Sequence, residues 1–333
     1  MKVLVIGGTR FVGLRLVKLL VGSGHDVTIL NRGKTAAQLP QGTKRLYADR
    51  RDSDAVKKTL AGQDFEVVFD ITAYDTRNLA PMVEIFSRKV AHYIFISTCG
   101  VYRTGIASPD NEESPRVNAQ TAGVGPYELN KVFCEDYLMT QFRHAGFPVT
   151  ILRCPFIYGP ENWMHDREFS YFVRLTIGRK LIVPGSGNTL LHLAHVDDVA
   201  GALVSASGNS QAIGQEFNIA GPEAVTIAEF MYTIAAVIQV SYKKVFVPAE
   251  TMKKLTKPVF PYPWEYGAEY SIAKAERILN FKPQPLGNGI RQTYLWWKNT
   301  LGVNGTRFEP GKLGYNVDLG YEDEVLAHEG QDG

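Results

Sequence analysis

The segment VIGGTRFVG, residues 5–13, constrains the fold of this chain more than any other part of the sequence. It follows a short apolar run and precedes a segment with the apolar spacing of a helix, so it predicts a tight turn between a buried strand and a helix. In such a turn Gly7 allows the sharp change of direction, Gly13 lets the helix pack close to the sheet, and the first N–H groups of the helix bind a pyrophosphate. The middle position of this glycine spacing is occupied by Arg10.

Short apolar runs alternate with segments of helical period through the first half of the chain. The runs KVLVIG, DVTILNRG, KRLYAD, EVVFDITAY and HYIFISTCG are typical of strands buried on both faces, and helical segments separate them. This alternation predicts an α/β fold, namely a Rossmann-type doubly wound parallel sheet with a smaller, interleaved C-terminal substrate lobe.

The same pattern predicts where the domains lie. We expect residues 1–155 plus 195–221 to form the dinucleotide-binding domain and residues 156–194 plus 222–299 to form the substrate-binding lobe. Residues 300–333 carry seven glycines and seven carboxylates. We expect them to form a C-terminal tail that is partly mobile.

The composition narrows the classes of partner. With 45% apolar residues, 21% charged residues and a net charge of +2, the chain lacks the strong basic excess of dedicated nucleic-acid binders. No apolar run reaches the roughly 18 residues that span a bilayer. The three cysteines show no C-x-x-C spacing, which fits a reducing compartment and predicts no metal site. We therefore expect a cytoplasmic protein that acts on a small molecule and does not contact a membrane, and we rank nucleic acid as a less favoured partner.

The residues after the second expected strand bear on the choice of dinucleotide. NAD enzymes usually place Asp or Glu there to bind the ribose 2'-hydroxyl, whereas this chain has Asn31, Arg32 and Lys34. With Arg10 on the same side of the ribose, two arginines would bind the 2'-phosphate of NADP, and NAD is the alternative. The other interpretation leaves both arginines as solvated surface cations. Asp49, at the end of the third strand, would accept from the adenine amino group or cap the next helix.

A Tyr and a Lys four residues apart on a helix lie on one face, so the ammonium can lower the pKa of the phenol. The spacing occurs at Tyr127/Lys131, Tyr270/Lys274 and Tyr294/Lys298. Only Tyr127 follows a fifth parallel strand, whose end presents Ser97 and Thr98 at the edge where such sheets bind ligands. We therefore expect the first pair to be catalytic and the other two to be structural.

The motifs GGTRFVG, ADRRD, ISTCGVY, YELNK, LRCPFIYGP and HVDDVA occur in this order over residues 3–200. Together they resemble the extended short-chain dehydrogenase/reductase superfamily, in its NAD-dependent epimerase/dehydratase branch. The resemblance implies hydride transfer between a secondary alcohol carbon and a nicotinamide. It also implies Tyr127 as the acid and base, Lys131 as its helper and Thr98 as the hydrogen-bonding partner of the reacting oxygen.

The resemblance further implies which residues bind the ligands. For the cofactor these are Gly7, Thr9, Arg10, Phe11, Val12, Gly13, Asn31, Arg32, Asp49, Arg50, Ile71, Thr72, Ala73, Tyr127, Lys131, Cys154 and Pro155. For the substrate they are Thr98, Cys99 and Phe156. For Cys99 the alternative is a small residue that fits the turn at the end of the strand.

The sequence departs from the family pattern at positions that bear on the identity of the substrate. The 4,6-dehydratases place Asp and Glu directly after the catalytic Thr, where this chain has Cys99 and Gly100, so we do not expect water elimination by that route. Nucleotide-sugar epimerases usually carry Asn at Phe156 and Arg at Leu191, so two usual diphosphate contacts are missing. The mixture is similar to an atypical subgroup that includes the chloroplast stem-loop RNA-binding proteins.

Three hypotheses for the function follow. The first is an NAD(P)-dependent epimerase or oxidoreductase acting on a sugar-like substrate, which includes nucleotide sugars. The second is an NADPH-dependent ketone reductase, and the third, of another class, is an RNA-binding or RNA-processing protein on the same fold. We also expect a homodimer, for which the stripe of Leu79, Val83 and Phe86 with Phe133 and Tyr137 would supply the interface, unless the stripe packs in the core.

Overall fold

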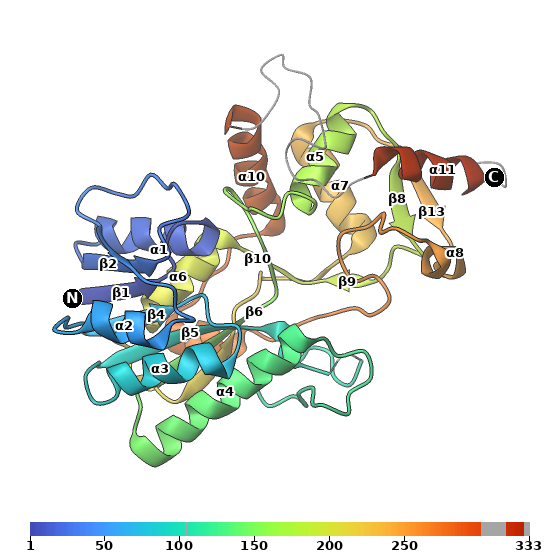
Figure 1. The fold of residues 1–333 in the computed structure, drawn as a ribbon. Coiled ribbons are helices and arrows are strands. Elements are labelled where there is room, and N and C mark those ends of the chain that lie inside the picture. The colour runs from blue at the N-terminus through green and yellow to red at the C-terminus, as the bar shows by residue number, and fades with distance from the viewer. Residues whose placement is uncertain (104, 301–317, 330–333) are drawn as a thin grey trace. The chain divides into compact units, whose positions relative to one another are not determined.

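The computed structural model describes residues 1–103, 105–300 and 318–329, and the chain divides into two compact units (Figure 1). Unit 1 comprises Met1–Ile157, Val196–Ala220 and Tyr270–Pro283, and unit 2 comprises Tyr158–His195, Gly221–Glu269 and Gln284–Gly333. The sequence assigned residues 270–283 to the second lobe, and the structure corrects this. The segment belongs to unit 1 because its helix α9 (Ala273–Leu279) packs against β11 (Gln215–Asn218), with the Lys274 ammonium 5.2 Å from the ring centre of Phe217.

Unit 1 is built on a seven-stranded parallel sheet with the strand order β11-β6-β5-β4-β1-β2-β3. The strands other than β11 are β1 (Lys2–Ile6), β2 (Asp26–Asn31), β3 (Lys44–Tyr47), β4 (Val67–Asp70), β5 (His92–Thr98) and β6 (Val149–Cys154). The order reverses between β1 and β4, which defines the switch point where such sheets bind their ligands. The predicted Rossmann-type fold is confirmed.

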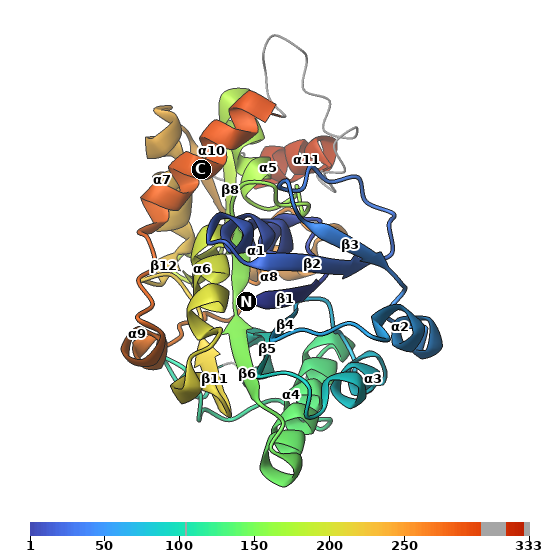
Figure 2. The same ribbon diagram turned by 90° about the vertical axis from the view of Figure 1, so that its left-hand side faces the viewer.

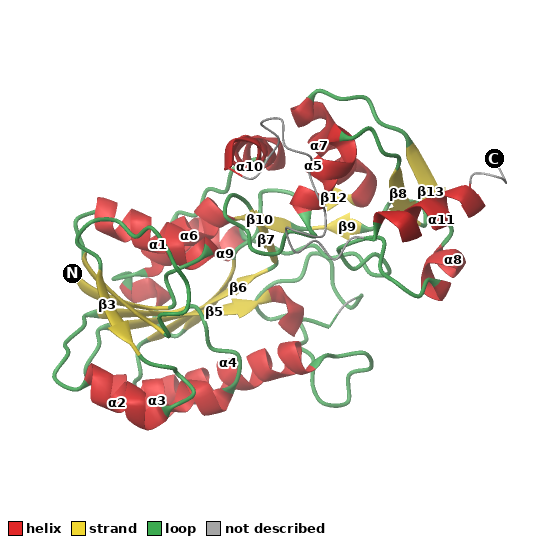
Figure 3. Cartoon of the chain, turned by 45° about the horizontal axis from the view of Figure 1, so that its top comes forward, coloured by secondary structure: helices red, strands yellow, loops and turns green. Residues whose placement is uncertain are grey.

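Helices cover both faces of this sheet (Figure 3). On one face lie α1 (Phe11–Gly22), α6 (Val196–Ala206) and α9, and on the other lie α2 (Ser53–Leu60), α3 (Thr76–Phe86) and α4 (Pro126–Ala145). Short 3-10 turns are η1 (Cys99–Val101) and η2 (Ser210–Ala212). Because both faces are covered, the central strands are apolar on both sides, as the sequence pattern predicted.

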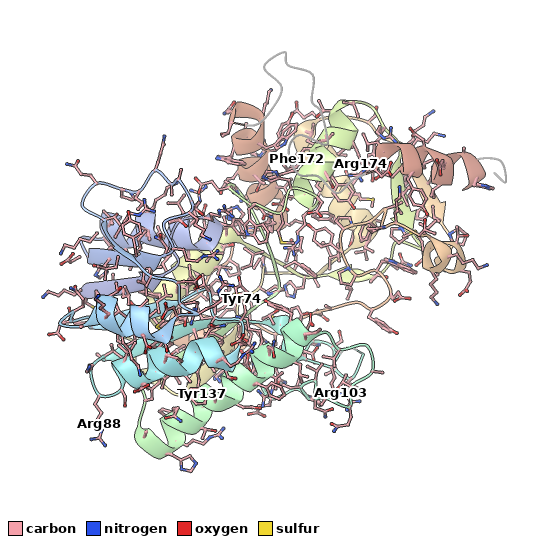
Figure 4. The ribbon with its side chains drawn as sticks, viewed as in Figure 1. Tyr74, Arg88, Arg103, Tyr137, Phe172 and Arg174 are labelled. Atoms are coloured by element: carbon pink, nitrogen blue, oxygen red, sulfur yellow. The ribbon has the colours of Figure 1, made fainter. Side chains whose placement is uncertain are left out.

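The expected interface stripe is divided between core and surface. Leu79, Val83 and Phe86 are at most 3% exposed and pack in the core between the sheet and helices α3 and α4. Tyr137, labelled on α4 in Figure 4, packs against the same core and is partly buried. Phe133 is 48% exposed. The alternative of core packing therefore holds for most of the stripe.

Unit 2 combines short strands with helices. Its elements are β8 (Leu181–Pro184), β9 (Leu190–Leu191), β10 (Leu193–His195), β12 (Val225–Thr226), β13 (Lys244–Val247), α5 (Glu168–Thr176), α7 (Ile227–Ile238), α8 (Ala249–Lys254), α10 (Leu286–Thr300) and α11 (Leu319–Glu329). The strand β7 (Phe156–Tyr158) carries the chain into this unit. Helix α10 packs on α7, as Figure 2 shows, and aromatic rings such as Phe172 and Trp297 fill the core between helices.

Part of the expected tail is ordered against unit 2. Arg174 on α5 forms a buried ion pair with Glu322 on α11, and Arg179 pairs with Asp323 at 2.6 Å. Residues 301–317 and 330–333, on which the expectation of mobility also falls, lie outside the described residues. Among the helices that the structure describes, none has both the length and the apolar character that crossing a membrane requires.

Candidate active site

The glycine turn after β1 requires its glycines. Gly7 has a φ of 121°, and a Cβ there would lie 2.9 Å from side-chain carbons of both Ile71 and Thr72. A Cβ on Gly13 would overlap the Ile71 side chain and the backbone of Gly8. The turn therefore packs directly on the residues that follow β4, and this close approach is possible only without side chains at these positions.

The start of α1 fits a phosphate group. Its N-cap residue Arg10 is extended, no side chain caps the helix, and no acidic residue lies in the first turn. The first N–H groups and the positive end of the helix dipole are therefore not neutralised by the protein's own carboxylates. Phe11 adopts a φ of 44°, an uncommon conformation for a non-glycine residue. Backbone strain of this kind is concentrated at functional sites.

Polar groups at the ends of β2 and β3 fit the adenosine half of a dinucleotide. The Asn31 Oδ1 accepts from the Gly33 N–H at 2.8 Å, while its Nδ2 is buried and has no hydrogen-bond partner within the described part of the chain. Buried donors are normally paired with an acceptor, so this amide fits a ligand that brings an oxygen to it. Arg10 and Arg32 are exposed. Asp49 binds Arg51 at 2.8 Å, and this hydrogen bond lowers the pKa of the Asp49 carboxyl to about 2.

Arg50 is more deeply paired than the sequence suggested. Its side chain is 12% exposed, and both terminal nitrogens of the guanidinium bind the buried carboxylate of Asp70. The guanidinium is thus held inside the protein by Asp70. This pairing favours a role below the site surface over the predicted direct contact with the cofactor, which stays a prediction.

The three expected catalytic residues lie together at the carboxyl edge of the sheet. Thr98 ends β5, and its Oγ1 accepts from the Gly100 N–H at 3.1 Å. Tyr127 lies in the first turn of α4, is 45% exposed, and has the Thr98 side chain close enough to lower the pKa of its phenol. Lys131 follows one helical turn later and is 2% exposed. The Pro126 at the start of α4 fixes where this helix begins, so it sets the height of Tyr127 above the edge.

The ammonium of Lys131 is enclosed by backbone and aromatic groups. Its Nζ donates to the carbonyl oxygens of Ala73 at 2.8 Å and Ile96 at 2.7 Å. It lies 4.6 Å from the ring centre of Phe95 and 5.2 Å from that of Tyr74. Burial lowers the pKa of the Lys131 ammonium to about 8.

The pKa of Tyr127 moves in the direction opposite to our expectation. Burial raises the pKa of the phenol to about 12, the Tyr74 phenol adds to the increase, and the hydrogen bond with Thr98 offsets part of it. Lys131 is turned toward the carbonyls below, so its charge does not acidify the phenol in this structure. The Tyr–Lys spacing correctly placed both residues on one helix face, but it did not reveal where the ammonium points.

Tyr74 is a site residue that the sequence analysis missed. It follows Ala73 after β4, its ring is 54% exposed, and the ring centres of Tyr74 and Tyr127 are 6.2 Å apart. Figure 4 labels it at this edge of unit 1. An available signal was its position directly after Ile71, Thr72 and Ala73, which were all predicted to contact the cofactor.

The residues predicted to meet the substrate differ in accessibility. Thr98 and Phe156 are half-buried. Cys99 is 1% exposed, and its Sγ donates to the Arg153 carbonyl at 3.3 Å. This burial favours the alternative, a small residue that fits the turn, over the expected contact with substrate. Cys154 is buried and Pro155 is half-buried, while the Ser97 hydroxyl is buried without a hydrogen-bond partner among the described residues.

The other two Tyr–Lys pairs lie elsewhere. The Tyr270 ring packs on Tyr102 with 6.0 Å between centres, and Tyr294 packs on Phe172 and Trp297 in the core of unit 2. Within the described ranges, no group of His, Cys, Asp and Glu side chains is arranged to hold a metal ion.

Comparisons with known proteins agree with this geometry. The model of the "NAD dependent epimerase/dehydratase family" matches residues 3–220. A relative from Arabidopsis thaliana, the chloroplast stem-loop binding protein of 41 kDa b, is 33% identical over 309 residues, which cover 88% of this chain and 78% of the relative.

Solved structures agree on the fold. A UDP-glucose 4-epimerase from Thermotoga maritima, solved with UDP-glucose, has a TM-score of 0.75 at 20% identity and covers 91% of this chain and 100% of its own. A dTDP-glucose 4,6-dehydratase from Bacillus anthracis, in complex with NAD, has a TM-score of 0.75 at 18% identity and covers 90% and 97% of the two chains. Both carry the sheet and helices described above.

Proposed function

Because the chain belongs to the NAD-dependent epimerase/dehydratase family, of the extended short-chain dehydrogenase/reductase type, we propose that it epimerises a sugar-like substrate by hydride transfer at a secondary alcohol carbon. The observation that carries this proposal is the half-exposed side chain of Tyr127, whose phenol pKa is lowered by the Thr98 side chain against the effect of burial, and which lies one turn from the buried ammonium of Lys131. This set of residues gives no evident advantage to a protein that only binds ligands.

Each residue of this set has a separate task. The dinucleotide, when bound, supplies the hydride acceptor and donor. The ionised form of Tyr127, which its raised pKa makes the minor form at neutral pH, takes the proton of the substrate hydroxyl and later returns it. The Thr98 hydroxyl donates a hydrogen bond to the same oxygen. Lys131 keeps a positive charge beneath the site and binds the carbonyl of Ala73, so it fixes the backbone that leads to Tyr74.

Two features support an anionic dinucleotide at unit 1, and a third supports NADP. The uncapped start of α1 and the glycine turn fit the pyrophosphate, as described above. Asn31 stands where a carboxylate would repel a 2'-phosphate, and the exposed Arg10 and Arg32 attract one. We therefore place NADP ahead of NAD as the preferred cofactor.

The proposed reaction is tested with a panel of nucleotide sugars. The purified protein is heated to release bound dinucleotide, which is identified and quantified against the protein concentration. It is then incubated with UDP- and dTDP-hexoses and NADP or NAD, and epimers are detected by NMR. Bound dinucleotide near one per chain with an epimer formed supports the proposal. Failure of every dinucleotide to bind contradicts it.

A reductase is the second candidate. Phe156 and Leu191 stand where nucleotide-sugar epimerases usually have polar diphosphate contacts, and Leu191 is 4% exposed. The apolar Phe156 favours a substrate without a diphosphate, and a reductase exchanges its cofactor at each turnover. Steady oxidation of NADPH with a sugar ketone, and no dinucleotide retained on purification, would favour this candidate over the epimerase.

RNA binding is the candidate of another class, and the 33% identity to a chloroplast stem-loop binding protein favours testing it. Lysines and arginines that contact phosphates make such binding strongly salt-dependent. The test is a gel-shift titration of a stem-loop RNA between 50 and 200 mM salt, on the order of the range over which such binding weakens. Binding that Tyr127→Phe leaves unchanged, together with no dinucleotide binding, would replace the enzymatic proposal.

A further inference from the structure

We propose that Arg50 and Asp70 form a buried clamp that positions the loops of unit 1 for dinucleotide binding, although neither side chain contacts the dinucleotide. The proposal rests on the cofactor site proposed above and goes beyond it, because it assigns a binding role to two residues below the site surface. Both are therefore positioning residues.

Arg50 joins three segments that are distant in sequence. It lies in the loop after β3, directly next to Asp49. Its Nη1 binds the Asp70 Oδ1 at 2.6 Å and the Thr72 Oγ1 at 3.0 Å, and its Nη2 binds the Asp70 Oδ2 at 2.8 Å and the Asn78 carbonyl at 3.0 Å. One guanidinium thus ties the loop after β3 to the end of β4 and to the first turn of α3.

Asp70 supplies the other half of the clamp from the end of β4. Its carboxylate is fully buried and accepts from the Tyr93 hydroxyl at 2.7 Å and the Thr72 N–H at 3.2 Å, in addition to Arg50. The paired charges keep both groups ionised, since Arg50 holds the pKa of Asp70 below its usual value despite burial. All the oxygens of this carboxylate are therefore occupied within unit 1.

The residues next to the clamp form the walls of the proposed cofactor site. Ile71 and Thr72 follow Asp70 and pack on Gly7 of the glycine turn, and Thr72 also donates to the Ile6 carbonyl at 3.3 Å. Asp49, which the proposed cofactor site places on the adenosine side, directly precedes Arg50. The clamp consequently fixes the spacing between the glycine turn, the adenosine loop and the segment that leads to Tyr74.

Stability alone does not explain this pair. The desolvation of two buried charges consumes most of their mutual attraction, and apolar replacements of similar volume are often neutral or stabilising. A bidentate Arg–carboxylate pair does, however, define one geometry, whereas apolar side chains in the same space permit several. The clamp therefore holds the binding loops in one conformation before the dinucleotide binds. This reduces the conformational entropy that the loops lose on binding.

The test separates folding from binding. The double variant Arg50→Met/Asp70→Leu removes both charges together, and a matched control, Arg174→Met/Glu322→Leu, removes the buried pair of unit 2. Thermal unfolding gives Tm, and fluorescence titration with NADPH and NADH gives Kd for the full-length proteins. We expect the Arg50/Asp70 variant to keep its Tm within a few degrees and to bind the better of the two dinucleotides at least about tenfold more weakly. The control variant should bind it with unchanged Kd.

Each other outcome counts against the clamp. An Arg50/Asp70 variant that binds as tightly as the unaltered protein overturns it, and so does a control variant that weakens binding to the same extent. If the double variant does not fold, Arg50→Lys is the replacement test, because it keeps the charge but loses the two-pronged geometry. Unchanged dinucleotide affinity in Arg50→Lys then overturns the clamp. If the unaltered protein binds neither dinucleotide, the proposed cofactor site itself fails.

Discussion

The ammonium of Lys131 is buried, where a charge is costly. The pH dependence of the protein's activity should therefore reveal the titration of this group. Burial lowers the pKa of its ammonium to about 8, although two carbonyl oxygens and two aromatic faces surround it. The charge is present below this value and is lost as the pH rises through it. The task proposed for Lys131 needs the charge, because the ammonium holds the carbonyls of Ala73 and Ile96 and so fixes the backbone that leads to Tyr74. The alkaline limit of the reaction therefore belongs to this lysine.

We therefore expect kcat/KM to fall as the pH rises above about 8. The measurement is a pH profile of kcat/KM from pH 6 to 10 for the substrate identified in the panel. Lys131→Arg, whose charge does not titrate in this range, should lose activity but show no such limb. An alkaline limb that persists in Lys131→Arg would assign the titration to another group.

Arg32 is the residue whose replacement tests the preference for NADP over NAD. We expect the unaltered protein to bind NADP more tightly than NAD, and Arg32→Ala to narrow the gap by roughly 1 to 3 kcal/mol, the size of a lost charge-assisted contact. The measurement is calorimetric titration with both dinucleotides. Arg88→Ala serves as the control because Arg88, labelled in Figure 4, follows the end of α3 that lies opposite the ligand edge. Equal affinities for NADP and NAD in the unaltered protein would contradict the predicted preference for NADP.

At the scale of elements, α7 begins with a complete capping box. The Thr226 Oγ1 accepts from the Glu229 N–H at 3.1 Å, and the Glu229 carboxylate accepts from the Thr226 N–H at 2.8 Å. Each side chain satisfies a backbone group that the helix itself leaves unpaired.

Thr226→Ala should lower the free energy of unfolding by about 1 kcal/mol, and Glu229→Ala should cost less once Thr226 has been replaced. Urea unfolding of the two single variants and the double variant measures this. Thr226→Ser keeps the hydroxyl and serves as the control. Fully additive effects of the two alanine replacements would show that the two residues do not act as a unit.

Elements were easier to predict than contacts for a physical reason. The spacing of apolar residues along the chain indicates whether a segment forms a strand or a helix. The glycine turn, the parallel strands and the helix that carries Tyr127 and Lys131 could therefore be predicted from the sequence. The direction of a long side chain depends on partners that only the fold brings together. For this reason no pattern in the sequence indicated that Arg50 points inward to Asp70 or that Lys131 points to Ala73. Cys99 differs in kind, because the sequence left open whether it contacts substrate or fits the turn, and only the fold shows that it is buried in the turn η1.

At the scale of the whole molecule, the two units carry buried groups that respond to acid in opposite directions. In unit 1, burial lowers the pKa of His92 to about 4, and its Nε2 lies 2.7 Å from the Thr150 Oγ1. In unit 2, burial raises the pKa of the Glu168 carboxyl to about 7, against hydrogen bonds from Asn162 and Gly159. The folded protein is therefore most stable when His92 is neutral and when Glu168 is protonated.

The signs of the two effects follow from linkage. For His92 the stability is present above its unfolded pKa of about 6.5 and is lost as the pH falls through 4, which amounts to about 3 kcal/mol. For Glu168 the stability is present below its unfolded pKa of about 4.5 and is lost as the pH rises through 7, also about 3 kcal/mol. Between pH 8 and pH 6.5 acidification should thus stabilise unit 2 before the protonation of His92 begins to destabilise unit 1.

Glu168→Gln isolates the effect of the carboxyl charge. Glutamine resembles the protonated carboxyl, so at pH 8 it should raise the free energy of unfolding by up to about 3 kcal/mol and at pH 5 change it little. Urea unfolding at pH 5, 6, 7 and 8 measures both values, with the exposed Glu265→Gln as the matched control that should show no such dependence. A stabilisation that is equal at pH 5 and pH 8 would mean that Glu168 does not titrate in this window. The acid response of unit 2 would then have to come from another group.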